Sequence, residues 1–174
     1  MTKVLRLTAL VATVAALALT ATEAAAAPVS ATGDATAKAR IMKPLVLKGT
    51  QNLDLGIIVL AGATAYTATV SLDRANAFDC DGNSGNVVCS GTHVRAIYNV
   101  AGTQGADVTI ASGPVSLGNG TDTLTLTPDH RATVTLANSG APGTNFFVGG
   151  SLSIPSTTSD GVYTGTFALT ADYQ

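Results

Sequence analysis

Two histidines, His93 and His130, are the first candidates for catalytic chemistry in this sequence. They are far apart along the chain, and each lies near an arginine or turn residues. No GxSxG segment or other nucleophile motif accompanies them. A hydrolase would need one of them within hydrogen-bond reach of an aspartate and a serine, and nothing in the spacing favours that arrangement. We therefore expect histidines in turns or in solvent, and a protein that is not an enzyme.

The carboxylates offer one pattern with metal-binding spacing. Asp79, Asp81 and Asn83 alternate as the first oxygen ligands of a calcium loop do. The pattern has Ser84 where such loops need glycine, and it lacks the late glutamate. A turn explains the same residues, because aspartate and asparagine accept hydrogen bonds from nearby backbone amides. We expect a turn and no cofactor, with calcium as the alternative.

The two cysteines, Cys80 and Cys89, are close in sequence and do not form a CxxC motif. In an oxidising compartment the simplest interpretation is a disulfide that closes a small loop. Such a crosslink contributes about 2–3 kcal/mol to stability. The cysteines therefore predict a structural bond and no redox or metal site.

The N-terminus has the three zones of a secretory signal peptide. Lys3 and Arg6 precede an apolar stretch over residues 7–20, and small residues follow it. We place the cleavage site after Ala26. The apolar run is shorter than the roughly 20 residues that a transmembrane helix needs. The sequence predicts export through the inner membrane to the periplasm, the cell surface or the medium.

Composition narrows the class of the mature chain. Removing residues 1–26 from 174 leaves 148, with 10 aspartates and 7 basic residues, a net charge of about −3. Nucleic-acid binding needs a concentrated basic face, which this composition does not suggest. Abundant threonine, valine and alanine favour strands. The mature chain has no second apolar segment long enough to span a membrane as a helix.

Period-2 alternation predicts strands throughout the mature chain. Turn signals recur about every 8–12 residues, which is typical of a β-sandwich. We expect a flexible extension at 27–36 and one all-β domain at 37–174, an immunoglobulin-like sandwich of Greek-key type. Gly118-Asn119-Gly120 predicts a hairpin turn, and Pro128 to His130 another. The predicted strands cover 37–47, 53–57, 66–73, 87–88, 93–100, 106–111, 121–127, 132–137, 146–154 and 162–173.

The C-terminal segment has the clearest alternation in the chain. Gly161 is fourteenth from the end, and Tyr173 is penultimate. The apolar residues between them share one parity, and polar residues take the other, which predicts a half-buried strand. The residues on the apolar parity are Tyr163, Phe167, Leu169, Ala171 and Tyr173. The expected core comprises Leu53, Leu55, Ile57, Val70, Leu72, Phe147, Leu152, Phe167 and Leu169.

This ending resembles the last strand of chaperone–usher pilus subunits, which are sandwiches completed by a strand from a neighbour. The wider chain is similar to the DUF4402 family of secreted bacterial proteins, taken to be pilin-like or related to spore-coat-type surface proteins, without an established activity. The family resemblance rests on residues 37–47 with Pro44, Leu53-Asp-Leu-Gly-Ile57, Phe147-Val-Gly-Gly-Ser-Leu152, Gly161-Val-Tyr-Thr-Gly165 and the last tyrosine.

The resemblance implies a pilus-like or surface-coat subunit of a Gram-negative bacterium, assembled by strand donation. Its partners would be other copies, a periplasmic chaperone and an outer-membrane usher. One wall of the acceptor groove would comprise Gly161, Tyr163, Phe167, Leu169 and Tyr173. The donor strand would present Val29, Ala31, Gly33, Ala35 and Ala37. The alternative is a free-standing adhesin or binding module, for which Tyr98 and Phe146 are the candidate exposed aromatic residues.

Overall fold

The computed structural model describes residues 33 and 35–174. The predicted signal peptide, its cleavage site, and Val29 and Ala31 of the predicted donor segment lie outside the described residues. Residues 40–174 form one compact unit. Within the described part of the chain, no helix has the length and apolar character needed to cross a membrane.

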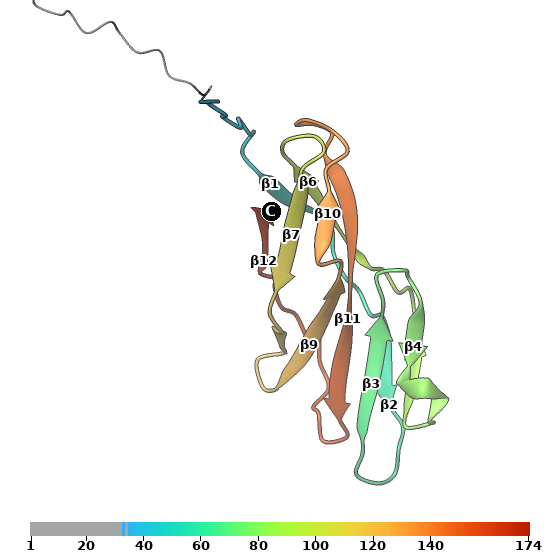
Figure 1. Ribbon diagram of the computed structural model, residues 1–174. Coiled ribbons are helices and arrows are strands. Elements are labelled where there is room, and N and C mark those ends of the chain that lie inside the picture. The colour runs from blue at the N-terminus through green and yellow to red at the C-terminus, as the bar shows by residue number, and fades with distance from the viewer. Residues whose placement is uncertain (1–32, 34) are drawn as a thin grey trace, which may run out of the picture. The chain divides into compact units, whose positions relative to one another are not determined.

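The larger of the sheets is antiparallel and has seven strands (Figure 1). Its central strand is β11, which pairs with β6, β3 and β9 along its length. The remaining strands extend from these three, with β1 on β6, β4 on β3 and β8 on β9. The bounds are β1 (Val46–Gln51), β3 (Thr67–Leu72), β4 (Phe78–Cys80), β6 (Ala96–Ala101), β8 (Val115–Gly118), β9 (Thr123–His130) and β11 (Thr144–Pro155).

A second sheet packs over one half of the first. It has the order β10-β7-β12, with β7 (Asp107–Ser112), β10 (Thr133–Thr135) and β12 (Leu169–Tyr173). A third, two-stranded sheet pairs β2 (Ile57–Leu60) with β5 (Val87–Ser90), and the short 3₁₀ helix η1 (Asp81–Asn83) lies between β4 and β5. The prediction of an all-β, sandwich-like fold is confirmed.

The long hairpin from β7 to β10 belongs to two sheets, because each of its arms crosses from one sheet to the other. β7 lies in the second sheet and β8 in the first; likewise β9 lies in the first sheet and β10 in the second. The predicted turn at Pro128 to His130 is therefore wrong, because β9 continues through these residues and Pro128 pairs with Gly150. β8 pairs with β9 only as far as Leu126, and a proline is compatible with a strand that has an open edge. The predicted hairpin turn at residues 118–120 is confirmed, since it joins β8 to β9.

The buried side chains form two clusters, one in each half of the sandwich. Leu55, Val70, Leu72 and Leu152 are buried as predicted, while Leu53, Phe167 and Leu169 are half-buried against the clusters. The first cluster contains Leu55, Ala68, Val70, Leu72, Val87, Val115, Leu124, Leu126, Leu152 and Ile154. The second contains Ala96, Val100, Val108, Ile110, Val134, Leu136, Phe146 and Val148.

Two residues of the predicted core, Phe147 and Ile57, lie outside it. Phe146, expected at the surface, is 3% exposed, and Phe147, expected in the core, lies outside both clusters. Neighbouring residues of a strand face opposite sides, so the choice between two adjacent phenylalanines decides which one is inside. Ile57 is 61% exposed because it faces outward from the two-stranded sheet.

The ends of the domain also differ from prediction. Residues 37–45 are outside the strands, and Ile41 is 92% exposed; pairing begins at Val46, after Pro44. At the other end, β12 begins at Leu169, and before it only Thr164 forms an isolated bridge, to Gly118. The predicted parity is nevertheless correct, since Tyr163, Phe167, Leu169, Ala171 and Tyr173 are half-buried between exposed neighbours.

Two tyrosines provide a test of how the first cluster is packed. The Tyr66 hydroxyl is buried and has no hydrogen-bond partner within residues 33 and 35–174, whereas the Tyr163 hydroxyl donates to the Ser159 carbonyl at 2.9 Å. Leaving a buried polar group unpaired costs free energy. We expect Tyr66→Phe to raise the free energy of unfolding by about 1 kcal/mol and Tyr163→Phe to lower it by about 1 kcal/mol. Urea denaturation measures both; changes of the same sign would contradict this packing.

Candidate functional site

Two strands, β1 and β12, each have one unpaired edge, a property that they share with β4, β8 and β10. β1 pairs with β6 on one side, and β12 pairs with β7 on one side. Among the described residues no strand pairs with the other side of either. A free edge leaves a row of backbone donors and acceptors available for an additional strand.

The side chains on these two strands are less buried than the rest of the second cluster. Every member of that cluster on β6, β7, β10 and β11 is at most 7% exposed. The residues on β12, on β1 and just before β1 that pack against it are half-buried, because nothing in the described chain covers their outer side. These half-buried residues, here called the open-edge residues, are Leu45, Leu47, Leu169, Ala171 and Tyr173.

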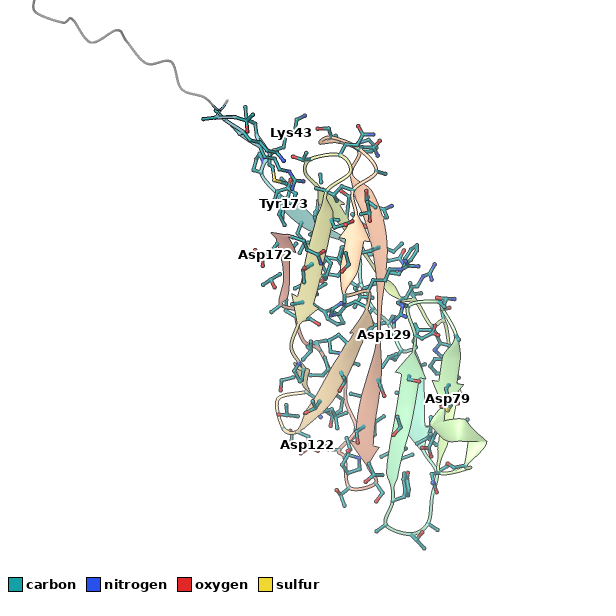
Figure 2. The ribbon with its side chains drawn as sticks, in the orientation of Figure 1. Lys43, Asp79, Asp122, Asp129, Asp172 and Tyr173 are labelled. Atoms are coloured by element: carbon teal, nitrogen blue, oxygen red, sulfur yellow. A yellow bond between two sulfur atoms is a disulfide. The ribbon has the colours of Figure 1, made fainter. Side chains whose placement is uncertain are left out.

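Tyr173 joins the two open edges at one end. Its hydroxyl donates to the Lys43 carbonyl at 2.6 Å and accepts from the Thr103 backbone amide at 2.7 Å. Figure 2 shows Lys43 and Tyr173 beside each other. A Cβ at Gly102 would lie 2.3 Å from the Tyr173 hydroxyl and 2.9 Å from Leu45, so the absence of a side chain there allows this contact. The penultimate tyrosine therefore fixes the spacing of the edges.

The predicted interface residues separate into two groups. Leu169 and Tyr173 are open-edge residues, and Phe167 packs against both clusters. Gly161 and Tyr163 lie instead at the β8–β9 turn, where Gly161 has a φ of 145° and approaches Asn119. Of the predicted donor residues, Gly33, Ala35 and Ala37 are exposed and outside the strands.

Hydrogen bonds hold the segment before β12 against the β8–β9 turn. Asp122 accepts from the Ser159 backbone amide at 2.7 Å, and Asn119 donates to the Ser159 hydroxyl and the Asp160 carbonyl. The bonds from Ser159, first its side chain and then its backbone, hold the pKa of Asp122 below its usual value. Ser159 and Asp160 thus anchor the approach to β12.

Both histidines bond to backbone carbonyls. His93 stacks on Phe78 with 3.5 Å between ring centroids, and its Nδ1 lies 2.9 Å from the Leu55 carbonyl oxygen. A carbonyl oxygen only accepts, so Nδ1 carries the proton. His130 Nδ1 makes the equivalent bond to the Arg131 carbonyl at 2.9 Å. In this arrangement His93 links the β2 and β4 regions.

The cysteines form the predicted disulfide, Cys80–Cys89, around η1. The acidic residues in this loop are occupied by internal hydrogen bonds. Asp79 accepts from the Gly82 amide, and Asp81 accepts from the Thr69 amide at 2.8 Å and from the Ser84 hydroxyl. These bonds, with Ser84 contributing most, hold the pKa of Asp81 below its usual value. Among residues 33 and 35–174, no group of three histidine, cysteine, aspartate or glutamate side chains is placed to hold a metal ion.

The aromatic residues considered for a binding module are not both at the surface. Phe146 is in the core, and Tyr98 is half-buried and stacks on it at 5.8 Å between ring centroids. Burial raises the pKa of the Tyr98 hydroxyl. These two rings therefore do not form an exposed aromatic cluster.

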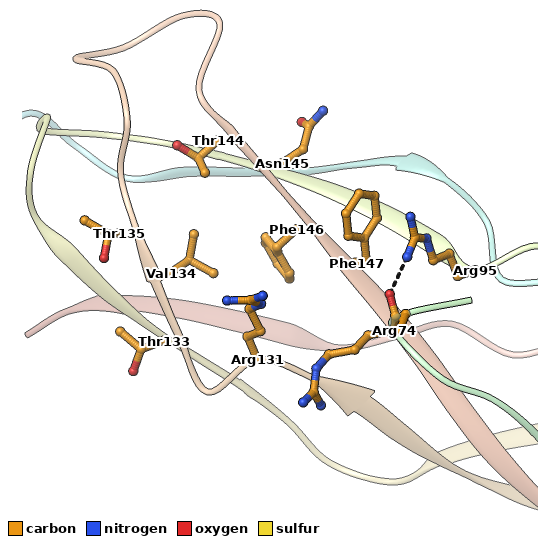
Figure 3. Close-up of a pocket in the computed structure, with 11 residues that line it drawn as sticks. Arg74, Arg95, Arg131, Thr133, Val134, Thr135, Thr144, Asn145, Phe146 and Phe147 are labelled. Carbon is orange, nitrogen blue, oxygen red and sulfur yellow. Dashed lines mark hydrogen bonds between the residues drawn. The ribbon is translucent and has the colours of Figure 1, made fainter. Parts of the chain in front are cut away.

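One feature was not anticipated from the sequence. Arg74, Arg95 and Arg131 border a depression of about 580 Å³ between β10 and β11 (Figure 3). Arg74 pairs with Asp129 at 2.5 Å, and the Arg95 guanidinium lies 3.6 Å above the Phe147 ring and donates to the Arg74 carbonyl. Arg74 and Arg95 are 21 positions apart in the sequence, and Arg95 and Arg131 are 36 apart, so no local motif indicates that they lie together.

Comparisons with known proteins give one match. A family model described as "Domain of unknown function (DUF4402)" matches residues 45–173. No curated protein matches the chain. No solved structure matches it either.

Proposed function

We propose that this chain, which belongs to the DUF4402 family, is an exported structural subunit whose sandwich is completed by a β-strand from another copy. The observation that carries the proposal is the pair of unpaired edges on β1 and β12, whose inward side chains stay half-buried. The resulting assembly would be a pilus-like filament or a surface coat.

An added strand would satisfy both properties of these edges. It would form main-chain hydrogen bonds along β12 or β1, and its alternate side chains would cover the open-edge residues. Burial of apolar surface contributes about 25 cal/mol per Å², so covering five partly exposed side chains gives the interaction a hydrophobic component. Addition of a strand therefore suits this side of the sandwich.

The source of the strand in the proposal is the segment 27–36, freed at the new N-terminus by signal cleavage. It precedes residues 45–173, the part that matches the family model. Its small residues would make a weak donor by contact area. A periplasmic chaperone and an outer-membrane usher would hold and deliver such subunits, and the disulfide is compatible with an oxidising compartment.

Deleting residues 27–36 tests the proposal. We expect the mature chain 27–174 to form filaments or high-mass ladders on unboiled gels, and the chain 37–174 to remain monomeric. Adding a synthetic peptide of residues 27–36 to the truncated chain should give a one-to-one complex in native mass spectrometry. Stable monomers with and without the segment would refute strand donation.

A matched pair of variants on β12 tests the acceptor side. Ala171 is an open-edge residue, whereas its neighbour Thr170 is exposed on the outer face. Ala171→Lys places a charge where the added strand would pack, so we expect loss of ladders and of peptide binding. Thr170→Lys introduces the same charge on the opposite face and should leave both unchanged. Unchanged assembly in both variants would locate the acceptor site elsewhere, and equal losses would show that the effect is not specific to the open-edge face.

A further inference from the structure

The depression between β10 and β11 brings together three of the four arginines in residues 35–174. They come from three separate strand junctions: Arg74 follows β3, Arg95 precedes β6, and Arg131 lies between β9 and β10. The whole chain has a net charge of −2, so this concentration of positive charge is not a consequence of composition. Like charges held together repel, and an anionic ligand would relieve that repulsion.

The charges in the depression are only partly compensated. Asp129 pairs with Arg74 and also accepts from its backbone amide at 2.9 Å. Within the described residues, that is the one ion pair found. Arg95 is fixed by Phe147 and the Arg74 carbonyl, neither of which cancels its charge. Arg131 is exposed and has no carboxylate partner in residues 33 and 35–174. Two positive charges therefore remain for a ligand.

The side of the depression formed by β10 supplies neutral hydrogen-bonding groups. The Ala132 carbonyl and the Leu136 amide bond toward β7. Because backbone groups alternate along an antiparallel strand, those of Thr133 and Thr135 face away from β7, toward the depression. Val134 and Phe146 add an apolar floor, as the close-up in Figure 3 shows.

The shape of the site favours a compact ligand. β10 is only three residues long, and beyond it the Ala137 amide donates to the Thr144 hydroxyl at 2.9 Å, which ties this segment to the start of β11. A long peptide strand could not add along this edge. A volume of about 580 Å³ lies within the usual range of small-molecule sites, roughly 300–1,000 Å³.

We propose that this depression binds an acidic sugar residue, one that carries a carboxylate or a sulfate. Guanidinium groups match these anions with paired hydrogen bonds, and the peptide groups of β10 suit sugar hydroxyls. The site is separate from the open edges of β1 and β12, so it would stay available in an assembled subunit. The ligand would be part of an acidic polysaccharide, with its charge at Arg95 and Arg131.

Titration of the mature protein with oligosaccharides tests this inference. Binding is monitored by changes in amide NMR chemical shifts, at low and at physiological salt. The probes are a glucuronate-containing disaccharide, a sulfated disaccharide, a neutral glucose disaccharide and sodium sulfate. We expect one or both acidic disaccharides to bind and to shift residues of β10 and β11, with the neutral sugar at least about tenfold weaker. Which acid binds more tightly identifies the anion. Binding of sulfate alone with no gain from the sugar would overturn the proposal.

Two arginine variants provide the specificity control. Arg131→Gln should weaken the acidic disaccharide at least about tenfold, because it removes a charged hydrogen-bond donor. Arg40→Gln removes the same charge from an exposed position that does not line the depression, and it should leave binding unchanged. Equal weakening by both would show a non-specific charge effect. Tighter binding of an aspartate tetrapeptide than of any sugar would assign the site to a protein partner and refute the proposal.

Discussion

Replacing Gly149 by alanine is expected to lower the free energy of unfolding by at least about 3 kcal/mol. A Cβ at this position would lie 2.0 Å from the Leu72 carbonyl oxygen and 2.6 Å from the Asp73 carbonyl carbon. Both are backbone atoms at the end of β3, so no rotation of a side chain relieves the overlap. β11 cannot move away, because β9 pairs with its other edge at the same level. The strand would have to separate from one of its partners.

Gly113→Ala is the matched control for this variant. Gly113 lies between β7 and β8, a Cβ there would meet no atom within 4 Å, and its φ is not positive. We expect its stability to stay within about 0.5 kcal/mol of the parent. Denaturant unfolding followed by circular dichroism compares the two variants with the parent. A Gly149→Ala protein as stable as the parent would mean that β11 and β3 are not packed as described.

The fold could be predicted from the sequence largely because strand periodicity is a local signal. Alternation correctly assigned the faces of the C-terminal segment, from Tyr163 to Tyr173. It was wrong where two apolar neighbours compete, as at Phe146 and Phe147, since either one satisfies the pattern. The separate turn prediction at Pro128 to His130 was also wrong, because these turn-forming residues lie inside β9, before the chain crosses to the other sheet. Such residues are read locally as a turn, whereas pairing with β11 keeps them extended.

The candidate sites differ in how far the sequence could indicate them. Leu169 and Tyr173 belong to one continuous segment, so their shared face was visible in the alternation. Their counterparts on the other edge, Leu45 and Leu47, lie at the end of the predicted strand 37–47. The arginine-bordered depression was not visible, because Arg74, Arg95 and Arg131 meet only after three strand junctions are brought together. Sites built across sheets need the topology before their residues can be grouped.

Removing the disulfide by replacing both Cys80 and Cys89 with serine is expected to lower the free energy of unfolding by about 2.5–3 kcal/mol. The bond closes a loop with a sequence separation of nine, and most of its effect comes from restricting the unfolded chain. It also joins β4, whose pairing with β3 spans three residues, to β5 in the separate two-stranded sheet. Both cysteines pack against the first cluster, so β2 and β5 should loosen before the second cluster does.

The parent protein under reducing conditions is the control for this variant, because it lacks the bond but keeps both sulfur atoms. We expect it to unfold at the same urea concentration as the double serine variant. Hydrogen exchange should show faster opening at the amides of Ile57 and Val59, which face β5, and little change at Val108 and Ile110 in β7, since β7 belongs to the other cluster. A uniform loss of protection across both clusters would mean that the two halves of the sandwich unfold as one unit, and that the disulfide supports the whole domain equally.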